Sequence, residues 1–112
     1  MFIAIVQIPI EPRSREDAVK AATASAPSFV AAPGLIRKYY LNGDSGGGGV
    51  YLWESREAAE AWYDDEWWVR AEKNFGVRPT VNYYENYVVV DNADDEVRID
   101  GEPINLQPAA AE

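Results

Sequence analysis

The spacing of apolar residues along the chain predicts four strands and two helical regions. Residues 2–9 alternate along the chain and are rich in β-branched side chains, which is typical of a strand. A helix is expected from about residue 15, because Ser14 is a good N-cap and Val19, Ala22, Ala26 and Phe29 keep helical spacing. Further strands are predicted at residues 35–41, 50–54 and 80–90. The order βαββαβ is that of a ferredoxin-like α+β fold.

Breaks between these elements are marked by proline, glycine and acidic residues. Pro27 has no backbone N–H, so the first helix is expected to break or kink there, before Pro33 and Gly34 end it. Residues 42–49 include four successive glycines and are expected to form a flexible hairpin loop. The second helical region begins after Ser55, bends at residues 64–66 and stops at Gly76.

The end of the chain is expected to extend the domain. We divide the chain into a ferredoxin-like domain at residues 1–92 and a C-terminal extension at residues 93–112. Asp100 and Gly101 lie between apolar residues and predict a small hairpin. Residues 108–112 are expected to fray.

Large side chains on both faces of the predicted sheet indicate a homodimer. Residues 35–41 and 83–90 carry apolar or aromatic groups at odd and even positions alike, so both sheet faces require cover. Two helices on one face leave the other face open. A second copy of the chain, packed sheet against sheet, is the simplest cover.

Composition restricts the chemistry and the location. The 112 residues suffice for one domain, and they include neither cysteine nor histidine. Disulfides, thiolate nucleophiles and Ser-His or Cys-His catalytic arrangements are therefore excluded. A chain without cysteine is expected to be cytoplasmic. The first strand lacks the basic start of a signal peptide, and no apolar run reaches the about 20 residues of a membrane span.

The charge of the chain argues against polyanionic partners. Nineteen acidic and ten basic residues give a net charge of −9, and the basic residues are scattered. Neither nucleic acid nor an anionic membrane is therefore an expected partner. Residues 91–96 have alanine where a calcium loop needs an oxygen ligand and glutamate where it needs glycine. Residues 64–66 fit a solvated helix bend, so no metal site is expected.

One face of the predicted second and third strands collects the residues with the most promising chemistry. These residues are Ile36, Lys38, Tyr40, Tyr51 and Trp53. The expected register pairs Tyr40 with Tyr51 and Lys38 with Trp53, and a one-residue slip would exchange these partners.

This face is expected to lie toward the helices, where Trp62 and Trp67 would complete an aromatic pocket for a flat ring. A lysine in such a pocket is partly desolvated, which lowers its pKa and lets it accept a proton or pair with a phenolate. The alternative is that Lys38 extends to the surface and the aromatic residues form core.

Several of these residues occur in a pattern that resembles the YdhR-type monooxygenases. Pro33, Gly34 and Leu35 are followed by Lys38, and the run Gly-Gly-Val-Tyr-Leu-Trp at residues 48–53 is followed by the Ser55 cap. The resemblance covers the chain from the first strand to about residue 92. It implies a ferredoxin-like protomer, a homodimer formed by sheet packing as a dimeric α/β barrel, and a cavity between sheet and helices.

The resemblance also implies kinship with cofactor-free oxygenases that convert phenolic or hydroquinone polyketides into quinones. In such reactions the substrate supplies the electrons to oxygen, so the protein binds and deprotonates an electron-rich ring and excludes water. Relatives can carry a histidine in the second helical region, where this chain has Glu66 and Trp67.

Three functions follow as hypotheses. The first is a cofactor-independent monooxygenase that acts on an aromatic or polyketide-like molecule without a metal. Lys38 and Tyr51 would be its catalytic residues, and its substrate rings would pack against Tyr40, Trp53, Trp62 and Trp67. The alternatives are a cyclase or isomerase that uses the same cavity and a non-catalytic protein that binds a small molecule.

Overall fold

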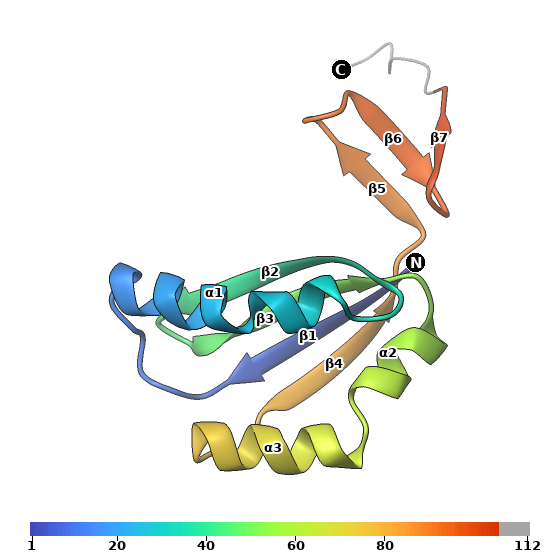
Figure 1. The fold of residues 1–112 in the computed structure, drawn as a ribbon. Coiled ribbons are helices and arrows are strands. Elements are labelled where there is room, and N and C mark those ends of the chain that lie inside the picture. Colours follow the sequence, from blue (N-terminus) through green and yellow to red (C-terminus); the bar gives the residue numbers. More distant parts are fainter. Residues whose placement is uncertain (106–112) are drawn as a thin grey trace.

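The chain folds into a four-stranded antiparallel sheet with helices on one face, followed by a smaller sheet (Figure 1). The structure is a computed structural model and describes residues 1–105. Its elements are β1 (Phe2–Ile8), α1 (Arg15–Val30), β2 (Leu35–Gly43), β3 (Gly46–Trp53), α2 (Arg56–Trp62), α3 (Asp65–Phe75), β4 (Thr80–Glu85), β5 (Val88–Asp91), β6 (Glu96–Ile99) and β7 (Glu102–Ile104). The main sheet has the order β2-β3-β1-β4. This is the ferredoxin-like arrangement, so the predicted α+β fold class is confirmed.

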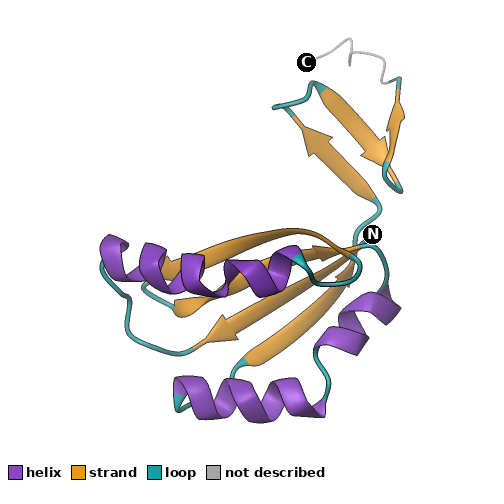
Figure 2. Cartoon of the chain, viewed as in Figure 1, coloured by secondary structure: helices purple, strands orange, loops and turns teal. Residues whose placement is uncertain are grey.

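The core lies between the main sheet and the three helices (Figure 2). Alternate residues of β1 point toward the helices and are buried; they are Phe2, Ala4, Val6 and Ile8. The other buried residues of this core are Ala32, Tyr51, Trp53, Ala59 and Tyr63. Side chains of β1 at the intervening positions belong to the other face of the sheet.

The helix boundaries follow local capping chemistry. The side chains of Ser14, Ser55 and Asp64 each accept a hydrogen bond from the backbone N–H three residues later. Asp64 thereby separates α2 from α3, which confirms the bend predicted at residues 64–66. Gly76 ends α3 with a φ of 73°, where a side chain would be strained.

The break predicted at Pro27 is wrong, because α1 continues through this residue to Val30. Pro27 removes one hydrogen bond, the one to the carbonyl of Thr23, and it lies in the last turn of the helix. Its own carbonyl still accepts from the N–H of Ala31 at 3.3 Å. The helix then ends before Pro33 and Gly34, as predicted.

The glycine run is part of β3 and not a loop, so the predicted extent of the hairpin loop is wrong. Only Asp44 and Ser45 separate β2 from β3. A Cβ atom at Gly48 would lie 2.0 Å from the carbonyl oxygen of Val6, and the φ of Gly48 is 129°. The neighbouring β1 therefore packs where only glycine leaves room.

The strand predicted at residues 80–90 is divided into two strands that belong to different sheets. β4 ends at Glu85, and the N–H of Asn86 donates to the carbonyl of Met1 at 3.0 Å. β5 pairs with β6, and β6 pairs with β7, in a sheet that extends away from the main body (Figure 1). The hairpin predicted at Asp100 and Gly101 is confirmed, with φ angles of 50° and 83°. The predicted fraying of residues 108–112 lies outside the described residues.

The second sheet has an ionic cluster centred on Arg98. Its guanidinium lies 3.1 Å from a carboxylate oxygen of Asp91, 3.1 Å from one of Asp94 and 2.7 Å from one of Glu96. Hydrogen bonding to Arg98 lowers the pKa of Asp91. The cluster joins β5, β6 and the turn between them.

The face of the main sheet that lies opposite the helices is largely apolar. Ile3, Ile5, Val50 and Leu52 are adjacent on it and are only partly buried, and Tyr39 has 55% of its surface exposed. In residues 1–105, no helix covers this face. None of the helices in this part of the chain is long and apolar enough to cross a membrane.

Candidate functional site

A cavity of about 780 Å³ lies between the inner face of the main sheet and the helices α1 and α3. β1, β2 and β3 supply its floor, and α1 and α3 supply its walls. This volume falls in the range of small-molecule sites in proteins.

Glycine residues on β3 and small side chains on α1 make room for the cavity. The inner face of β3 carries Gly47 and Gly49 and then Tyr51 and Trp53, so one half of the strand is bare and the other half is aromatic. The wall from α1 is built mainly from small residues: Ala18, Ala21, Ala22, Ser25 and Ser28. The result is an open space that ends against an aromatic wall.

The side chain of Lys38 lies at this aromatic wall. Its Nζ is 3.4 Å from the centroid of the Phe29 ring, 3.8 Å from that of Tyr40 and 4.7 Å from that of Tyr51. None of the ion pairs within residues 1–105 includes Lys38. Burial without a carboxylate partner lowers the pKa of Lys38 to about 7. The amine can therefore exchange a proton near neutral pH.

Lys38 is paired with Tyr51 across the sheet, so the predicted register is wrong. Tyr40 is paired with Gly49, two residues from the expected partner. The two-residue turn at residues 44–45 fixes this register, because the glycines extend β3 toward the turn. A two-residue shift keeps each side chain on its face, so Lys38, Tyr40 and Tyr51 still share the helix side.

Ile36 does not lie in the cavity, contrary to the prediction. The register between β2 and β3 shifts between Leu35 and Arg37, which leaves Ile36 as the extra residue of a bulge with 43% of its surface exposed. Leu35 packs against the core in its place.

Tyr51 is 4% exposed and is held by aromatic contacts. Its ring is stacked on Trp53 with an interplanar angle of 8° and meets the edge of Tyr63 at 90°. Burial raises the pKa of the Tyr51 phenol, and the nearby Tyr40 raises it further. Tyr51 therefore remains protonated at neutral pH, and its hydroxyl is able to donate a hydrogen bond.

The other predicted aromatic residues occupy two layers. Tyr40, Trp62 and Trp67 line the cavity, and the hydroxyl of Tyr40 is 2.8 Å from that of Ser25 on α1. Trp53 is fully buried behind Tyr51 and is not part of the cavity wall. The structure thus brings five of the six predicted residues to the cavity and places Trp53 in the layer that supports Tyr51.

Phe29 is a central residue of the site that the sequence reasoning assigned only to the apolar stripe of the first helix. Its ring contacts Lys38, and its centroid lies 6.2 Å from Tyr40, 5.7 Å from Tyr51 and 5.4 Å from Trp62. Helical spacing correctly indicated a position on the inner side of the helix, where Phe29 is partly buried. Helical spacing does not indicate which residue of the sheet Phe29 contacts.

Polar residues that line the cavity were also missed. They are Arg13, Asn42, Arg70 and Asn74. Two of them could have been recognised, since Arg70 and Asn74 follow Trp67 by three and seven residues and so share its helix face. Within residues 1–105, no group of three or more acidic side chains is placed to hold a metal ion.

Comparison with known proteins is consistent with this architecture. The crystal structure of a monooxygenase from the gene ActVA-Orf6 of Streptomyces coelicolor, in complex with the ligand Nanaomycin D, has a similar fold with a TM-score of 0.57. The sequences are 18% identical, and the match covers 80% of this chain and 89% of that chain. No curated protein matches the chain. The family model described as "Putative mono-oxygenase ydhR" matches residues 3–93, and the chain therefore belongs to the YdhR monooxygenase family.

Proposed function

We propose that this protein is a cofactor-independent monooxygenase that acts on an aromatic, polyketide-like small molecule. The observation that carries the proposal is the Lys38 amine, which lies against three aromatic rings in a cavity of about 780 Å³. Membership of the monooxygenase family supports the reaction class. The structural neighbour binds the ligand Nanaomycin D, and we extend the binding of a small molecule to the cavity of this chain.

The proposed reaction requires only oxygen and an electron-rich ring. A ketone that carries a ring methylene and has a phenol tautomer, such as anthrone, loses a proton and then transfers electrons to O₂. One oxygen atom replaces the two methylene hydrogens as a carbonyl, and the other leaves as water with these hydrogens. The substrate supplies all four electrons, so the step is balanced without a separate reductant.

Lys38 is the proposed general base, because an amine with a pKa of about 7 is present in its neutral form at working pH. Tyr51 is paired with it across the sheet and remains protonated, so it is the proposed donor to the oxyanion that forms. Tyr40, Trp62 and Trp67 are proposed to pack against the substrate rings. Trp53 is proposed to support binding by holding the ring of Tyr51 from behind.

Oxygen uptake with anthrone tests this proposal. We expect Tyr51→Phe to lower turnover by about a hundredfold while the protein still folds, because one donor to a developing oxyanion is lost. The matched control is Tyr39→Phe, which removes a hydroxyl from the opposite face of the sheet. Equal activity of Tyr51→Phe and Tyr39→Phe would contradict the role of Tyr51. Turnover that proceeds at full rate without oxygen would instead identify a cyclase or isomerase, and tight binding without turnover would identify a binding protein.

We also propose a homodimer formed through the outer face of the main sheet. Tyr84 is 52% exposed and Leu41 is 42% exposed on this face, beside Ile3, Ile5 and Leu52. A contiguous apolar sheet face of this kind is typical of a buried interface. A second copy presents the same face and can cover it by two-fold symmetry.

The proposed division of the chain places the ferredoxin-like domain at residues 1–92 and the extension at residues 93–112. β5 lies in the first part and is paired with β6 of the second, so a β-ladder joins the two. The location that we propose is cytoplasmic, in keeping with a chain that has no cysteine.

A further inference from the structure

The charge of the cavity wall is opposite to that of the whole chain. The chain has nineteen acidic and ten basic residues, yet neither aspartate nor glutamate lines the cavity. Three basic residues line it: Arg13, Lys38 and Arg70. A cavity with two guanidinium groups and no carboxylate attracts an anion, and its low-dielectric wall strengthens this attraction.

The backbone of Arg13 is hydrogen-bonded to the side chain of Asn42, which fixes its position at the cavity. Its N–H donates to Oδ1 of Asn42 at 2.9 Å, and Nδ2 of Asn42 donates to its carbonyl at 2.9 Å. This reciprocal pair attaches the connection between β1 and α1 to the end of β2. The Arg13 side chain therefore starts from a fixed point on the cavity rim.

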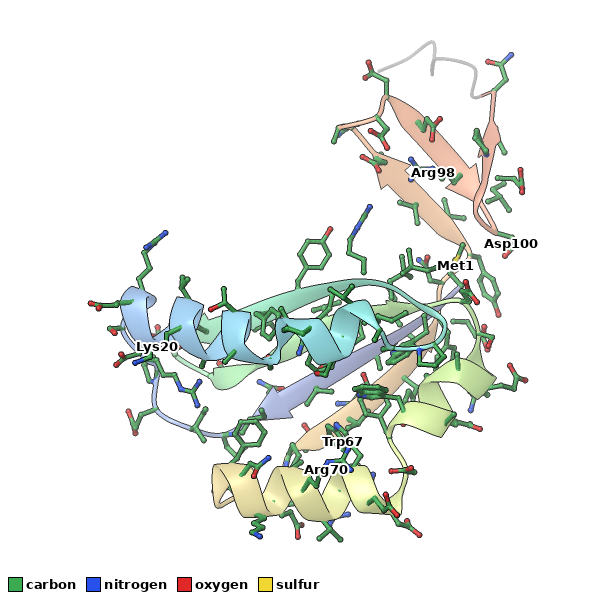
Figure 3. All side chains as sticks on the ribbon, in the orientation of Figure 1. Met1, Lys20, Trp67, Arg70, Arg98 and Asp100 are labelled. Atoms are coloured by element: carbon green, nitrogen blue, oxygen red, sulfur yellow. The ribbon has the colours of Figure 1, made fainter. Side chains whose placement is uncertain are left out.

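Arg70 reaches the cavity from α3. It lies one turn after Trp67, on the side of α3 nearer the sheet in Figure 3, and Asn74 follows one turn later. Trp67 and Ala71 on this side are partly or fully buried, whereas Arg70 lines the cavity and is also exposed to solvent.

The two arginines of the cavity differ from three other arginines in residues 1–105. Arg56, Arg78 and Arg98 lie outside the cavity, and each of them contacts a carboxylate. The ion pairs in this part of the chain include neither Arg13 nor Arg70. Both guanidinium groups are thus available to a ligand.

We infer that the aromatic substrate also carries a carboxylate, which Arg70 and Arg13 bind. A guanidinium presents two parallel N–H donors that match the two oxygens of a carboxylate, so it orients the ligand as well as holding it. This inference rests on the proposed function, from which the aromatic part of the substrate is taken. It divides the cavity into a cationic part for the carboxylate and the aromatic wall with Lys38 for the ring that reacts.

Isothermal titration calorimetry with two matched probes tests the inference. The probes are a hydroxynaphthoic acid and the naphthol that lacks only its carboxylate. We expect the acid to bind about tenfold more tightly or better, with a preference that decreases as salt is added. Arg70→Gln and Arg13→Gln are each expected to remove most of this preference and to leave the affinity for the naphthol within about twofold. Arg70→Lys is expected to retain part of it, because the charge remains without the paired donors.

Lys73→Gln is the matched control, because it removes one positive charge from the same helix at a residue that does not line the cavity. Equal affinity of the wild-type protein for both probes would overturn the inference. An equal loss of preference in Lys73→Gln and Arg70→Gln would overturn it too, since the effect would then come from overall charge. Binding is measured without turnover, so a preference for the acid stands even where no oxygen is consumed. Conversely, oxygen uptake by a protein that shows no preference for the acid would refute the inferred substrate carboxylate and would leave the proposed monooxygenase function standing.

Discussion

The Nζ atom of Lys38 lies 3.4 Å from the centroid of the Phe29 ring, so a residue of β2 and a residue of α1 meet across the cavity wall. Two effects act on this amine. The ring face stabilises the ammonium form, whereas burial favours the neutral amine and lowers the pKa of Lys38 to about 7. The contact therefore places a proton acceptor in an apolar site and also fixes its position.

The lowered pKa of Lys38 predicts a particular dependence of stability on pH. Above about pH 7 the folded chain has released the Lys38 proton, whereas the unfolded chain keeps it until about pH 10. Because the unfolded state binds more protons in this window, the free energy of unfolding rises with pH. We expect the wild-type protein to gain on the order of 1 kcal/mol relative to Lys38→Met between about pH 7 and pH 9.5, after allowance for solvent screening at a partly exposed amine.

Urea denaturation of both proteins across this window measures the difference. The methionine variant keeps the length of the side chain and removes the titrating group. Parallel pH profiles for the two proteins would show that Lys38 keeps an ordinary pKa in the folded state.

Gly49 is expected to be required for the arrangement of the two proposed catalytic residues. A Cβ atom at this position would lie 3.1 Å from Cε of Lys38 and 3.1 Å from Cε1 of Tyr51. We expect Gly49→Ala to displace both side chains, to lower turnover by about tenfold or more and to destabilise the fold by roughly 1–3 kcal/mol. Oxygen uptake and urea denaturation measure the two effects.

The matched control is Gly43→Ala at the end of β2, where a Cβ atom meets nothing within 4 Å. This variant is expected to retain activity and to change stability by less than about 0.5 kcal/mol. If Gly49→Ala were as active as Gly43→Ala, the close approach of Lys38 and Tyr51 would have no bearing on function.

The proposed dimer predicts the effect of a charge on the outer face of the sheet. Ile5 lies at the centre of this face, beside Val50 and Asn82. Ile5→Glu would bury a charge in the interface, so we expect light scattering on a sizing column to give the 12.5 kDa monomer instead of a dimer. Val30→Glu is the control, since Val30 is 88% exposed at the end of α1. A wild-type monomer, or a dimer that persists in Ile5→Glu, would refute this interface.

Much of the fold could be predicted from the sequence because its signals are local. The caps at Ser14 and Ser55 and the stop at Gly76 depend on one or two hydrogen bonds, and the structure contains them. The register of β2 and β3 depends on whether glycines form loop or strand. A glycine run is compatible with both, and only the packing of β1 against Gly48 decides between them.

Part of the membership of the site could be predicted from the sequence, but the depth of each residue could not. Strand alternation places Lys38, Tyr40 and Tyr51 on one face even when the register is wrong by two residues. The same alternation cannot tell that Trp53 lies behind Tyr51, because depth depends on the helices above it. Arg70 was missed because an arginine on a helix is usually solvated, and only the tertiary fold shows that it lines a cavity.

The central claim is that Lys38 deprotonates an aromatic substrate that then reacts with oxygen. Its most direct test is the pH dependence of oxygen uptake with anthrone, measured on protein treated with chelator and free of bound cofactor. For the wild-type protein we predict a rate that rises with an apparent pKa near 7 and then stays level, because the neutral amine is the active form. For Lys38→Met we predict a rate lower by about a hundredfold or more, with no inflection near neutral pH. A rate and a pH profile unchanged in Lys38→Met would contradict the account.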